Sequence, residues 1–367
     1  MKKLFSAATV ALTLGLSTSA FADSIDPVSY SDTLSVGESV TITKTVIVND
    51  EAPSTGLIDV MFLMDTSGSM GSEINQAKAA IGDIISGLGA FGDVATGVGY
   101  FSDPGSAGVL SDLSTTSTDT ASALSSISLC DGGCGGDFPE EGIFATYDAA
   151  TNASWRPGST RFIIALSDAN FKESDGVTLA DTKTALNDED ITFIGINYGS
   201  LYSGMNSTSS GGIAASELSD ATGGSIIQSS GLDTADLVDD ITDGVTAAFE
   251  NYSEVSVGDL GAGLPGVDVS VTCLTADTGT CVGDTAVGDF DRELTRTFTY
   301  EVTFTALEEG VHAFDTCALV DGGCVATEAD TITVRGATAS VSEPGTLALM
   351  LMGFAGLGLA RRRTAKS

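Results

Sequence analysis

Oxygen-bearing side chains follow apolar segments of the sequence at several points. The clearest case is the apolar run at 58–64, which Asp65, Ser67 and Ser69 follow directly. One carboxylate and two hydroxyls at alternate positions are hard oxygen donors of the kind that Mg²⁺ and Ca²⁺ prefer. The pattern therefore predicts a divalent-cation site, with helix capping by Asp65 and Ser67 as the simpler alternative.

Two further acidic residues are candidates for the same site. Asp168 comes two positions after the apolar run at 161–166, and Glu140 lies in the acidic segment 137–140. In open α/β sheets, ligands bind at the carboxyl ends of the strands. We therefore expect Asp65, Glu140 and Asp168 to converge at one sheet edge, although acids near the start of a helix are also ordinary helix-entry chemistry.

The region 57–250 alternates between apolar strands and amphipathic helices, and so supplies the elements that would position these residues. A strand buried on both faces is apolar throughout, as in a parallel sheet, whereas a helix carries apolar residues on one face. The expected strands are 58–64, 94–101, 161–166, 191–198 and 225–228, and the expected helices are 72–88, the second half of 110–129, 137–152, 177–186, 213–221 and 235–250. This alternation predicts an α/β fold with a doubly wound, mainly parallel sheet.

Alternating β-branched and polar residues flank that region on both sides. They occur at 40–48 within residues 23–56, and at 267–273, 298–304 and 331–334 within residues 251–336. A lone strand is not stable, so the strand at 40–48 needs a partner elsewhere in the chain. We therefore predict a small all-β sandwich, with the α/β domain at 57–250 inserted in it.

The six cysteines fall into three close pairs. The pairs are Cys130–Cys134, Cys273–Cys281 and Cys317–Cys324. Many connectivities are possible in principle, but local pairing is the simplest because Gly- and Asp-rich turns bound each pair. The chain has one histidine and no CxxC motif, which argues against a cysteine metal site. For an exported protein we expect three structural disulfides.

Both ends of the sequence carry targeting patterns. Residues 1–22 combine two lysines, an apolar run and a small-x-small cleavage site, which predicts a secretory signal peptide. At the other end, residues 342–363 contain Glu343, Pro344 and Gly345, an apolar run and three arginines. That run is shorter than the roughly 20 residues of an ordinary spanning helix, so it predicts a short transmembrane anchor with a cytoplasmic arginine cluster.

The charge of the chain limits its partners. The 367 residues include 50 acidic and 15 basic residues, a formal net charge of −35. Nucleic acid is therefore excluded as a partner, because phosphate binding needs Lys and Arg. Such acidity fits cation binding, but it is also common for a merely solvated surface.

The motifs of the α/β region resemble the von Willebrand factor type A (vWA) domain and its metal-ion-dependent adhesion site. The family pattern DxSxS falls on Asp65, Ser67 and Ser69, and the later family Asp falls on Asp168. The segment 137–140 is similar to the D-x-P-E loop of integrin β I-like domains, which places a metal-binding Glu at Glu140. Many other relatives use a Thr instead, for which Thr146 is the alternative.

The resemblance implies one divalent cation, Mg²⁺ first, with Ca²⁺ and Mn²⁺ as alternatives. Ser67 and Ser69 would bind it directly, Asp65 and Asp168 directly or through water, and Glu140 would be exchangeable. The second integrin cation site uses acids shortly after DxSxS, where Ser72 and Glu73 stand here, so one cation is implied. The expected partner is a protein or matrix ligand that presents a carboxylate.

The carboxyl-terminal tail resembles the PEP-CTERM sorting signal of Gram-negative bacteria. That resemblance implies processing by an exosortase-type enzyme, transient membrane anchoring, and a final location in the cell envelope or outside the cell. Integrin β subunits insert their I-like domain in a β-sandwich, and this offers an analogy for the topology predicted above.

Three functions can be compared on the sequence. The first is adhesion through the cation, and the second is a structural matrix component in which the cation only stabilises the fold. The third, an aspartic-protease-like enzyme, would pair the Asp-Thr motifs at Asp65 and Asp277, but Ser67 stands where that chemistry needs Gly. A Ser-His hydrolase fails because His312 is far from any G-x-S-x-G motif. We therefore expect a binding protein and no enzyme.

Overall fold

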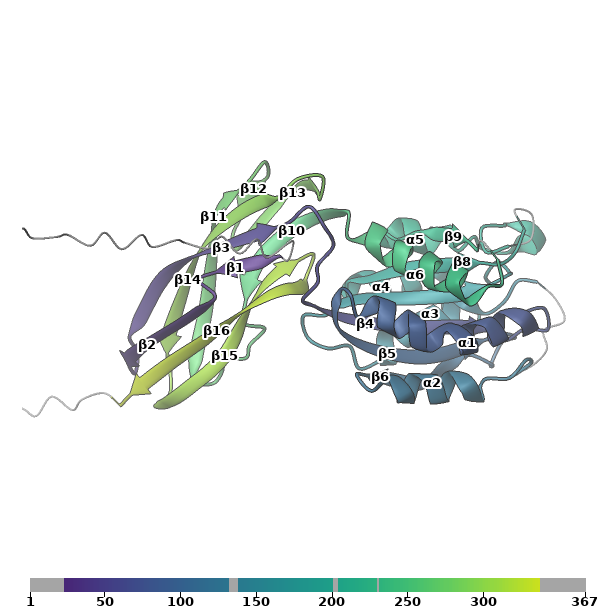
Figure 1. The fold of residues 1–367 in the computed structure, drawn as a ribbon, viewed down its shortest axis with the longest axis horizontal. Helices are drawn as coiled ribbons and strands as arrows, with labels where there is room; N and C mark the ends of the chain where they lie inside the picture. The colour runs from purple at the N-terminus through teal and green to yellow at the C-terminus, as the bar shows by residue number, and fades with distance from the viewer. Residues whose placement is uncertain (1–22, 132–137, 201–203, 230, 337–367) are drawn as a thin grey trace, which may run out of the picture.

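The protein consists of two regions that lie end to end (Figure 1). The computed structural model describes residues 23–131, 138–200, 204–229 and 231–336. Residues 56–248 form an α/β region, and the residues on either side of it form two facing sheets. Among the described residues, no helix is long and apolar enough to cross a membrane. The predicted signal peptide and the tail at 342–363 lie outside the described residues.

The α/β region is built on a six-stranded sheet in the order β6-β5-β4-β7-β8-β9. All neighbouring strands in it are parallel except β5 and β6. The strands are β4 (Gly56–Asp65), β5 (Gly92–Phe101), β6 (Gly108–Ser114), β7 (Thr160–Ser167), β8 (Ile191–Asn197) and β9 (Ile226–Gln228). The helices are α1 (Gly71–Leu88), α2 (Ser117–Ser126), α3 (Gly142–Asn152), α4 (Leu179–Asp188), α5 (Ser216–Thr222), α6 (Thr234–Ala248) and the short η1 (Ser209–Gly211).

Helices cover both faces of this sheet, as its apolar strands require. Alternate residues of β4 face opposite sides: Val60 and Phe62 pack in one core with α1, α2 and α6, whereas Met61 and Leu63 pack in another with α3, α4 and α5. Both layers exclude water from a strand that is apolar along its length. The predicted fold class, a doubly wound and mainly parallel α/β sheet accompanied by an all-β part, is confirmed.

The two sheets of the second region combine strands from both ends of the described chain. One has the order β1-β3-β14-β11, and the other the order β12-β13-β10-β15-β16-β2. The bounds are β1 (Ser24–Asp26), β2 (Ser29–Ser35), β3 (Ser39–Val48), β10 (Asn251–Gly258), β11 (Val267–Ala276), β12 (Thr280–Val282), β13 (Thr285–Asp291), β14 (Arg296–Ala306), β15 (Gly310–Val320) and β16 (Gly323–Arg335). Strand β3 pairs with β14 along its whole length, so the strand at 40–48 has its partner after the α/β region.

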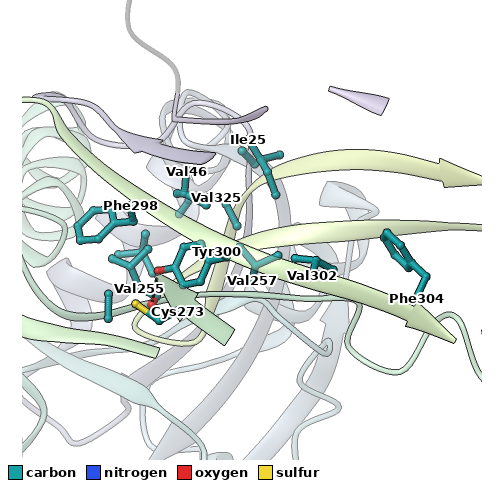
Figure 2. Packing of buried hydrophobic residues seen from close by; sticks show 14 of the residues in the cluster. Ile25, Val46, Val255, Val257, Cys273, Phe298, Tyr300, Val302, Phe304 and Val325 are labelled. Carbon is teal, nitrogen blue, oxygen red and sulfur yellow. Dashed lines mark hydrogen bonds between the residues drawn. The ribbon is translucent and has the colours of Figure 1, made fainter. Parts of the chain in front are cut away.

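One apolar core joins these two sheets into a sandwich (Figure 2). Phe298, Tyr300, Val302 and Phe304 point inward from β14, and all four are fully buried. The hydroxyl of Tyr300 donates a hydrogen bond of 2.6 Å to the carbonyl of Val255 in the opposite sheet. A buried phenol needs such a partner, and here the bond also fixes the sheets against each other.

Arg292 stabilises the junction between the sandwich and the α/β region. Its guanidinium pairs with the buried carboxylate of Asp23 at 2.8 Å and donates to the carbonyls of Asn49, Glu51 and Phe249. Glu51 precedes β4, and Phe249 follows α6, so both chain crossings are held by one side chain. A planar guanidinium with five donors suits this task.

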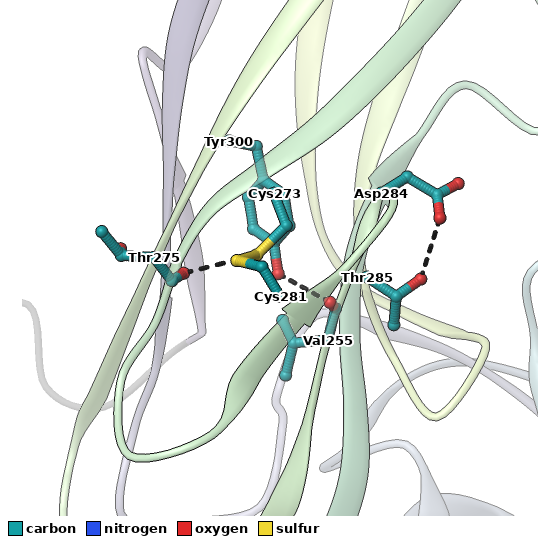
Figure 3. Close-up of a disulfide and its surroundings, with 7 residues drawn as sticks. All are labelled: Val255, Cys273, Thr275, Cys281, Asp284, Thr285 and Tyr300. Carbon is teal, nitrogen blue, oxygen red and sulfur yellow. Dashed lines mark hydrogen bonds between the residues drawn. A yellow bond between two sulfur atoms is a disulfide. The ribbon is translucent and has the colours of Figure 1, made fainter.

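Two of the three predicted disulfides are confirmed, Cys273–Cys281 and Cys317–Cys324. The first joins β11 to β12 beside Tyr300 (Figure 3), and the second joins β15 to β16. Such bonds are typical of proteins that fold in an oxidising compartment. Cys134 lies outside the described residues, so the pair Cys130–Cys134 stays a prediction.

Several strands were absent from the sequence prediction: β1, β2, β6 and β12 lie at sheet edges, whereas β10, β13 and β15 lie inside a sheet. The segment expected to be irregular before α2 contains β6, which pairs antiparallel with β5 at the edge of its sheet. Short edge strands carry polar residues, which hide the alternation that identifies a strand. The same reason applies to β1, β2 and β12.

Candidate metal centre

The carboxylate of Asp65 is fixed at the carboxyl end of the central strand β4. It is fully buried. Its Oδ1 accepts a hydrogen bond of 2.8 Å from the backbone N–H of Ser67, and its Oδ2 accepts one of 2.6 Å from the hydroxyl of Ser167. Ser167 ends β7, the neighbour of β4. The two adjacent strand ends therefore hold Asp65 in one orientation.

The two predicted hydroxyl ligands lie next to this carboxylate. The Oγ atoms of Ser67 and Ser69 are 3.3 Å apart. Ser69 is exposed and donates a hydrogen bond of 3.0 Å to Oδ1 of Asp168, which follows β7. The turn after β4 and the turn after β7 thus meet through side chains, as the prediction required.

Glu140 reaches the same edge from the loop before α3. Its backbone N–H donates to the carbonyl of Asn170, and its own carbonyl accepts from the N–H of Lys172. The next residue, Glu141, donates its N–H to the carbonyl of Ser102 after β5. Glu140 is therefore held between the chain that follows β7 and the chain that follows β5. These contacts connect it to the predicted edge, although it lies outside every regular element.

Burial dominates the electrostatics of the carboxylates in the site. Glu140 is 3% exposed, and its Oε2 is buried without a hydrogen-bond partner. Burial, with the charge of Asp65 as a further cause, raises the pKa of Glu140 to about 8 against the opposing charge of Lys172. Burial likewise raises the pKa of Asp65 to about 6, although hydrogen bonds from Ser167 and Ser67 oppose the shift. A buried carboxylate without a partner is costly unless a cation or a proton balances it.

The donor set fits a small divalent cation. Three carboxylates and two hydroxyls gather around the ends of β4 and β7, and Mg²⁺ and Ca²⁺ take oxygen ligands of these kinds. Within the described part of the chain, no group of three or more His, Cys, Asp or Glu side chains could hold a metal by itself. The hydroxyls of Ser67 and Ser69 are therefore needed to complete the set.

Part of the chain matches a known protein family. Residues 59–216 match the family model of the von Willebrand factor type A domain. The match covers less than half of the chain, and we call the α/β region that contains it the vWA domain. A vWA domain is typical of proteins that take part in protein interaction or adhesion.

Solved structures that resemble the chain include a von Willebrand factor type A protein from Catenulispora acidiphila, at 16% identity and a TM-score of 0.39, covering 86% of this chain and 73% of that one. The conserved hypothetical protein BatB from Bacteroides thetaiotaomicron is similar at 14% identity and a TM-score of 0.37, over 52% of this chain and 98% of that one. Proximal thread matrix protein 1 from the mussel byssus gives 16% identity and a TM-score of 0.39, over 57% and 48%. No curated protein matches the chain.

Other residues that the sequence singled out lie away from the centre of the vWA site. Thr146, the alternative to Glu140, is buried within α3 and donates its hydroxyl to the carbonyl of Gly142. Asp277 lies in the sandwich, where it pairs with Arg296 at 3.2 Å, so it forms no carboxylate pair with Asp65. His312 is also in the sandwich, with Nε2 2.9 Å from the carbonyl of Glu308. Asp137 lies outside the described residues.

The sequence did not reveal the supporting residues Ser167 and Glu141. Ser167 orients Asp65, and Glu141 accepts hydrogen bonds from the hydroxyl of Ser174 and from the backbone N–H groups of Gly105 and Ser106. Ser167 directly precedes Asp168 at the end of an apolar strand, so its position gave a signal. The sequence around Glu141 contains no such signal, because the role of Glu141 depends on the loop after β5.

Proposed function

We propose that this chain is an exported binding protein whose vWA domain binds an acidic group of a partner through a divalent cation. The observation that carries the proposal is the gathering of Asp65, Glu140 and Asp168 with two serine hydroxyls at one sheet edge, where Glu140 Oε2 has no hydrogen-bond partner. A site with this deficit of positive charge favours a cation over an apolar ligand.

Each residue has a distinct task in this proposal. Ser67 and Ser69 supply neutral oxygen ligands, and Asp65 and Asp168 hold those serines through the hydrogen bonds described above. Glu140 supplies a negative charge from its loop. No hydrogen bond holds its Oε2 in place, which suits an exchangeable ligand. A bound cation would supply a Lewis-acidic position for a carboxylate of the partner. Mg²⁺ is the first choice, with Ca²⁺ and Mn²⁺ as alternatives.

The position of the site on the molecule supports adhesion. The amino end of β4 touches the sandwich, where Gly56 lies beside the carbonyl of Cys324. The carboxyl ends of the parallel strands, which carry the site, point away from the sandwich (Figure 1). The carboxyl end of β16 lies at the far end of the sandwich (Figure 1). A chain anchored beyond β16 would thus display the site outward.

A groove beside the serines offers room for the partner's residues next to its carboxylate. It has a volume of about 620 Å³ and is lined by Ser69, Asn75, Lys78 and Leu129 among others. Leu129 is 44% exposed and Ile74 also lines the groove, which therefore combines apolar contacts with polar edges. This composition suits a protein ligand, which is the partner class that we propose.

The same proposal includes the route to the cell surface. The signal peptide at 1–22 would export the chain, and an exosortase-type enzyme would process the tail at Glu343, Pro344 and Gly345 after transient membrane anchoring. The final location would be the envelope or the exterior of a Gram-negative bacterium. The two disulfides of the sandwich support an oxidising compartment.

The test combines cation titration with a binding assay. Mg²⁺, Ca²⁺ and Mn²⁺ are titrated separately into the wild type, Asp65→Ala and the matched control Asp83→Ala, which changes an exposed residue of α1. Melting temperature and binding to labelled surface extract of the producing bacterium are followed together. Cation-dependent binding that is lost only in folded Asp65→Ala supports the proposal.

Two results would count against it. A cation that raises the melting temperature without any binding would favour the structural alternative, in which the metal only stabilises the fold. Binding that survives both chelation and the Asp65→Ala substitution would place the interaction surface elsewhere.

A further inference from the structure

A lysine and two carboxylates lie together inside the β-sandwich. Lys44 comes from β3 in the four-stranded sheet, and Glu328 and Asp330 come from β16 in the six-stranded sheet. The exposed fractions of the three residues are 0%, 0% and 1%. Lys44 Nζ is 2.6 Å from Glu328 Oε2 and 3.1 Å from Asp330 Oδ2. The cluster therefore bridges the two sheets through the core.

The surroundings of this cluster are aromatic and dry. Lys44 Nζ lies 5.1 Å from the ring centre of Phe304, on which Tyr30 stacks at 5.6 Å. Phe314 is the register partner of Asp330 on β15. One polar neighbour is close, since the hydroxyl of Thr316 donates to Asp330 Oδ2. Glu328 Oε1 and Asp330 Oδ1 have no hydrogen-bond partner.

An arrangement of one cation and two anions is a poor way to stabilise a core. Burying an ion pair costs about as much as the attraction returns, and apolar residues of the same volume are often at least as stable. A second carboxylate leaves a negative charge that the lysine does not balance. The cluster does, however, hold an amine, an acyl carbon and a proton carrier in contact, and water is excluded around them.

We propose that Lys44 Nζ and Asp330 Cγ join in an intramolecular amide bond, with Glu328 as the proton carrier. The reaction starts when the Lys44 ammonium gives one proton to the Asp330 carboxylate, which leaves an amine and a carboxylic acid. The nitrogen lone pair forms the N–C bond at Cγ. Glu328 takes a proton from that nitrogen and returns it to the departing hydroxyl, the C–O bond breaks, and water leaves. Nothing is oxidised or reduced, and no other reactant is needed.

The contacts assign the two carboxyl groups to different roles. Asp330 Oδ2 accepts from both Lys44 and Thr316, so Oδ2 is the oxygen that takes the lysine proton and departs in the water molecule. Glu328 lies within proton-transfer distance of Lys44 Nζ. Burial raises the pKa of Glu328 to about 7, against the opposing effect of Lys44, so near neutral pH this carboxyl can both take and give a proton.

The bond would have a mechanical consequence. Strand β3 is the last strand before the vWA domain, and β16 is the last strand of the described chain. An amide between them ties the first half of the sandwich to the strand that leads to the tail. A load applied at the vWA domain would then reach β16 through β3 as well as through β10.

The test is the mass of the purified exported chain after its disulfides are reduced, with peptide mapping to fix both ends. The wild type is expected to be lighter than its sequence by one water, and protease digestion is expected to release a branched peptide that links Lys44 to Asp330. Asp330→Asn is expected to lose one ammonia instead, because an amide nitrogen then departs. Glu328→Gln, which keeps the shape of the core, is expected to show the full sequence mass.

One control variant and three contrary outcomes complete the test. Lys183→Arg changes a half-buried lysine that pairs with Glu217 far from the cluster, and this variant should still lose one water. A wild-type mass equal to the sequence would show an ion pair and overturn the proposal, whether or not the variants fold. A branch between Lys44 and Glu328 would overturn the assignment of Asp330, and loss of water in Glu328→Gln would overturn the role of Glu328.

Discussion

The two clusters of buried carboxylates in this chain differ in the source of the positive charge that would balance them. At the edge of the vWA sheet, Asp65 and Glu140 are buried, while Ser69 beside them is exposed to solvent. In the sandwich, Glu328 and Asp330 contact Lys44, and all three are sealed in the core. One cluster is open and lacks a cation in direct contact among the described residues, whereas the other is closed and contains one.

This difference separates a binding site from a structural device. At the open cluster, a cation or a proton from solution balances the negative charge. The extent of binding then depends on cation concentration and pH. A partner group that the chain supplies itself, such as Lys44, is present in every folded molecule. In the functions that we propose, the same chemistry, carboxylates in a medium of low dielectric, serves recognition at one end of the molecule and cohesion at the other.

The largest effect is expected from Lys44→Met. Removing the lysine leaves two buried carboxylates without a cation, which costs about 3–5 kcal/mol in the free energy of unfolding. The same substitution prevents the proposed amide, which forms from these groups, so the two losses are one effect and not a sum. The sandwich should therefore melt earlier, while the cation affinity of the vWA domain stays unchanged. Calorimetry that resolves the two regions, with and without Mg²⁺, measures both quantities.

Lys183→Met is the matched control for that experiment. Lys183 forms a surface pair with Glu217 at 2.7 Å, so its loss should cost at most about 1 kcal/mol. If the two lysine variants lose the same stability, or if Lys44→Met weakens cation binding, the two clusters are not independent and the comparison fails.

Glu140→Gln, at the open cluster, should instead increase the free energy of unfolding. In cation-free solution at pH 8, the variant should be more stable than the wild type by about 2 kcal/mol, because a neutral amide replaces a buried charge that has no partner. The neighbouring Glu141→Gln should instead be destabilised, since Glu141 already accepts hydrogen bonds from Ser174, Gly105 and Ser106. Denaturant unfolding after chelation measures both variants, and a loss of stability in Glu140→Gln would contradict the proposed charge deficit.

The pH dependence of cation affinity follows from the raised pKa values. Without a cation, the folded protein holds a proton on Glu140 up to about pH 8, whereas the unfolded chain releases it near the usual pKa of a glutamate. Cation-free stability from this group therefore falls as pH rises through that window. A cation must displace the proton, so Mg²⁺ affinity should rise on the order of fiftyfold between pH 6 and pH 8.

Isothermal titration at several pH values, in buffers with different ionisation enthalpies, counts the released protons directly. The same series on Glu140→Gln should show a much weaker pH dependence, with Asp65, whose pKa lies at about 6, as the remaining titrating group. An equal pH dependence in the two proteins would assign the proton to another residue.

The sequence predicted the interior of the α/β region better than its edge. Strands such as β4 and β7 are apolar along their length, and only a buried parallel strand tolerates that composition. Edge strands such as β6 are polar and short, so composition did not distinguish them from loops. The predicted site residues Asp65, Ser67, Ser69 and Asp168 come together because parallel strands must end at one edge of the sheet.

The residues that were missed depend on contacts between distant segments. Ser167 supports Asp65 only because β7 lies beside β4, and strand order cannot be read from a single sequence. Lys44 lies on the same face of β3 as Val46 and Val48, so its place in an apolar row was a visible signal of burial. The carboxylates that meet it come from β16, almost at the other end of the chain, and no local pattern connects them.

The smallest effects are expected from the two hydroxyls that support a carboxylate in each cluster. Ser167→Ala removes the 2.6 Å hydrogen bond to Asp65, and Thr316→Val removes the hydrogen bond to Asp330. Each should cost about 1 kcal/mol, because each carboxylate keeps a second donor, the N–H of Ser67 or the ammonium of Lys44. Only Ser167→Ala should also weaken Mg²⁺ binding, since it frees Asp65 to move, and titration of both variants measures this. If Thr316→Val changed Mg²⁺ affinity as much, the sandwich would be coupled to the open edge, and the separation between a binding end and a cohesive end would not hold.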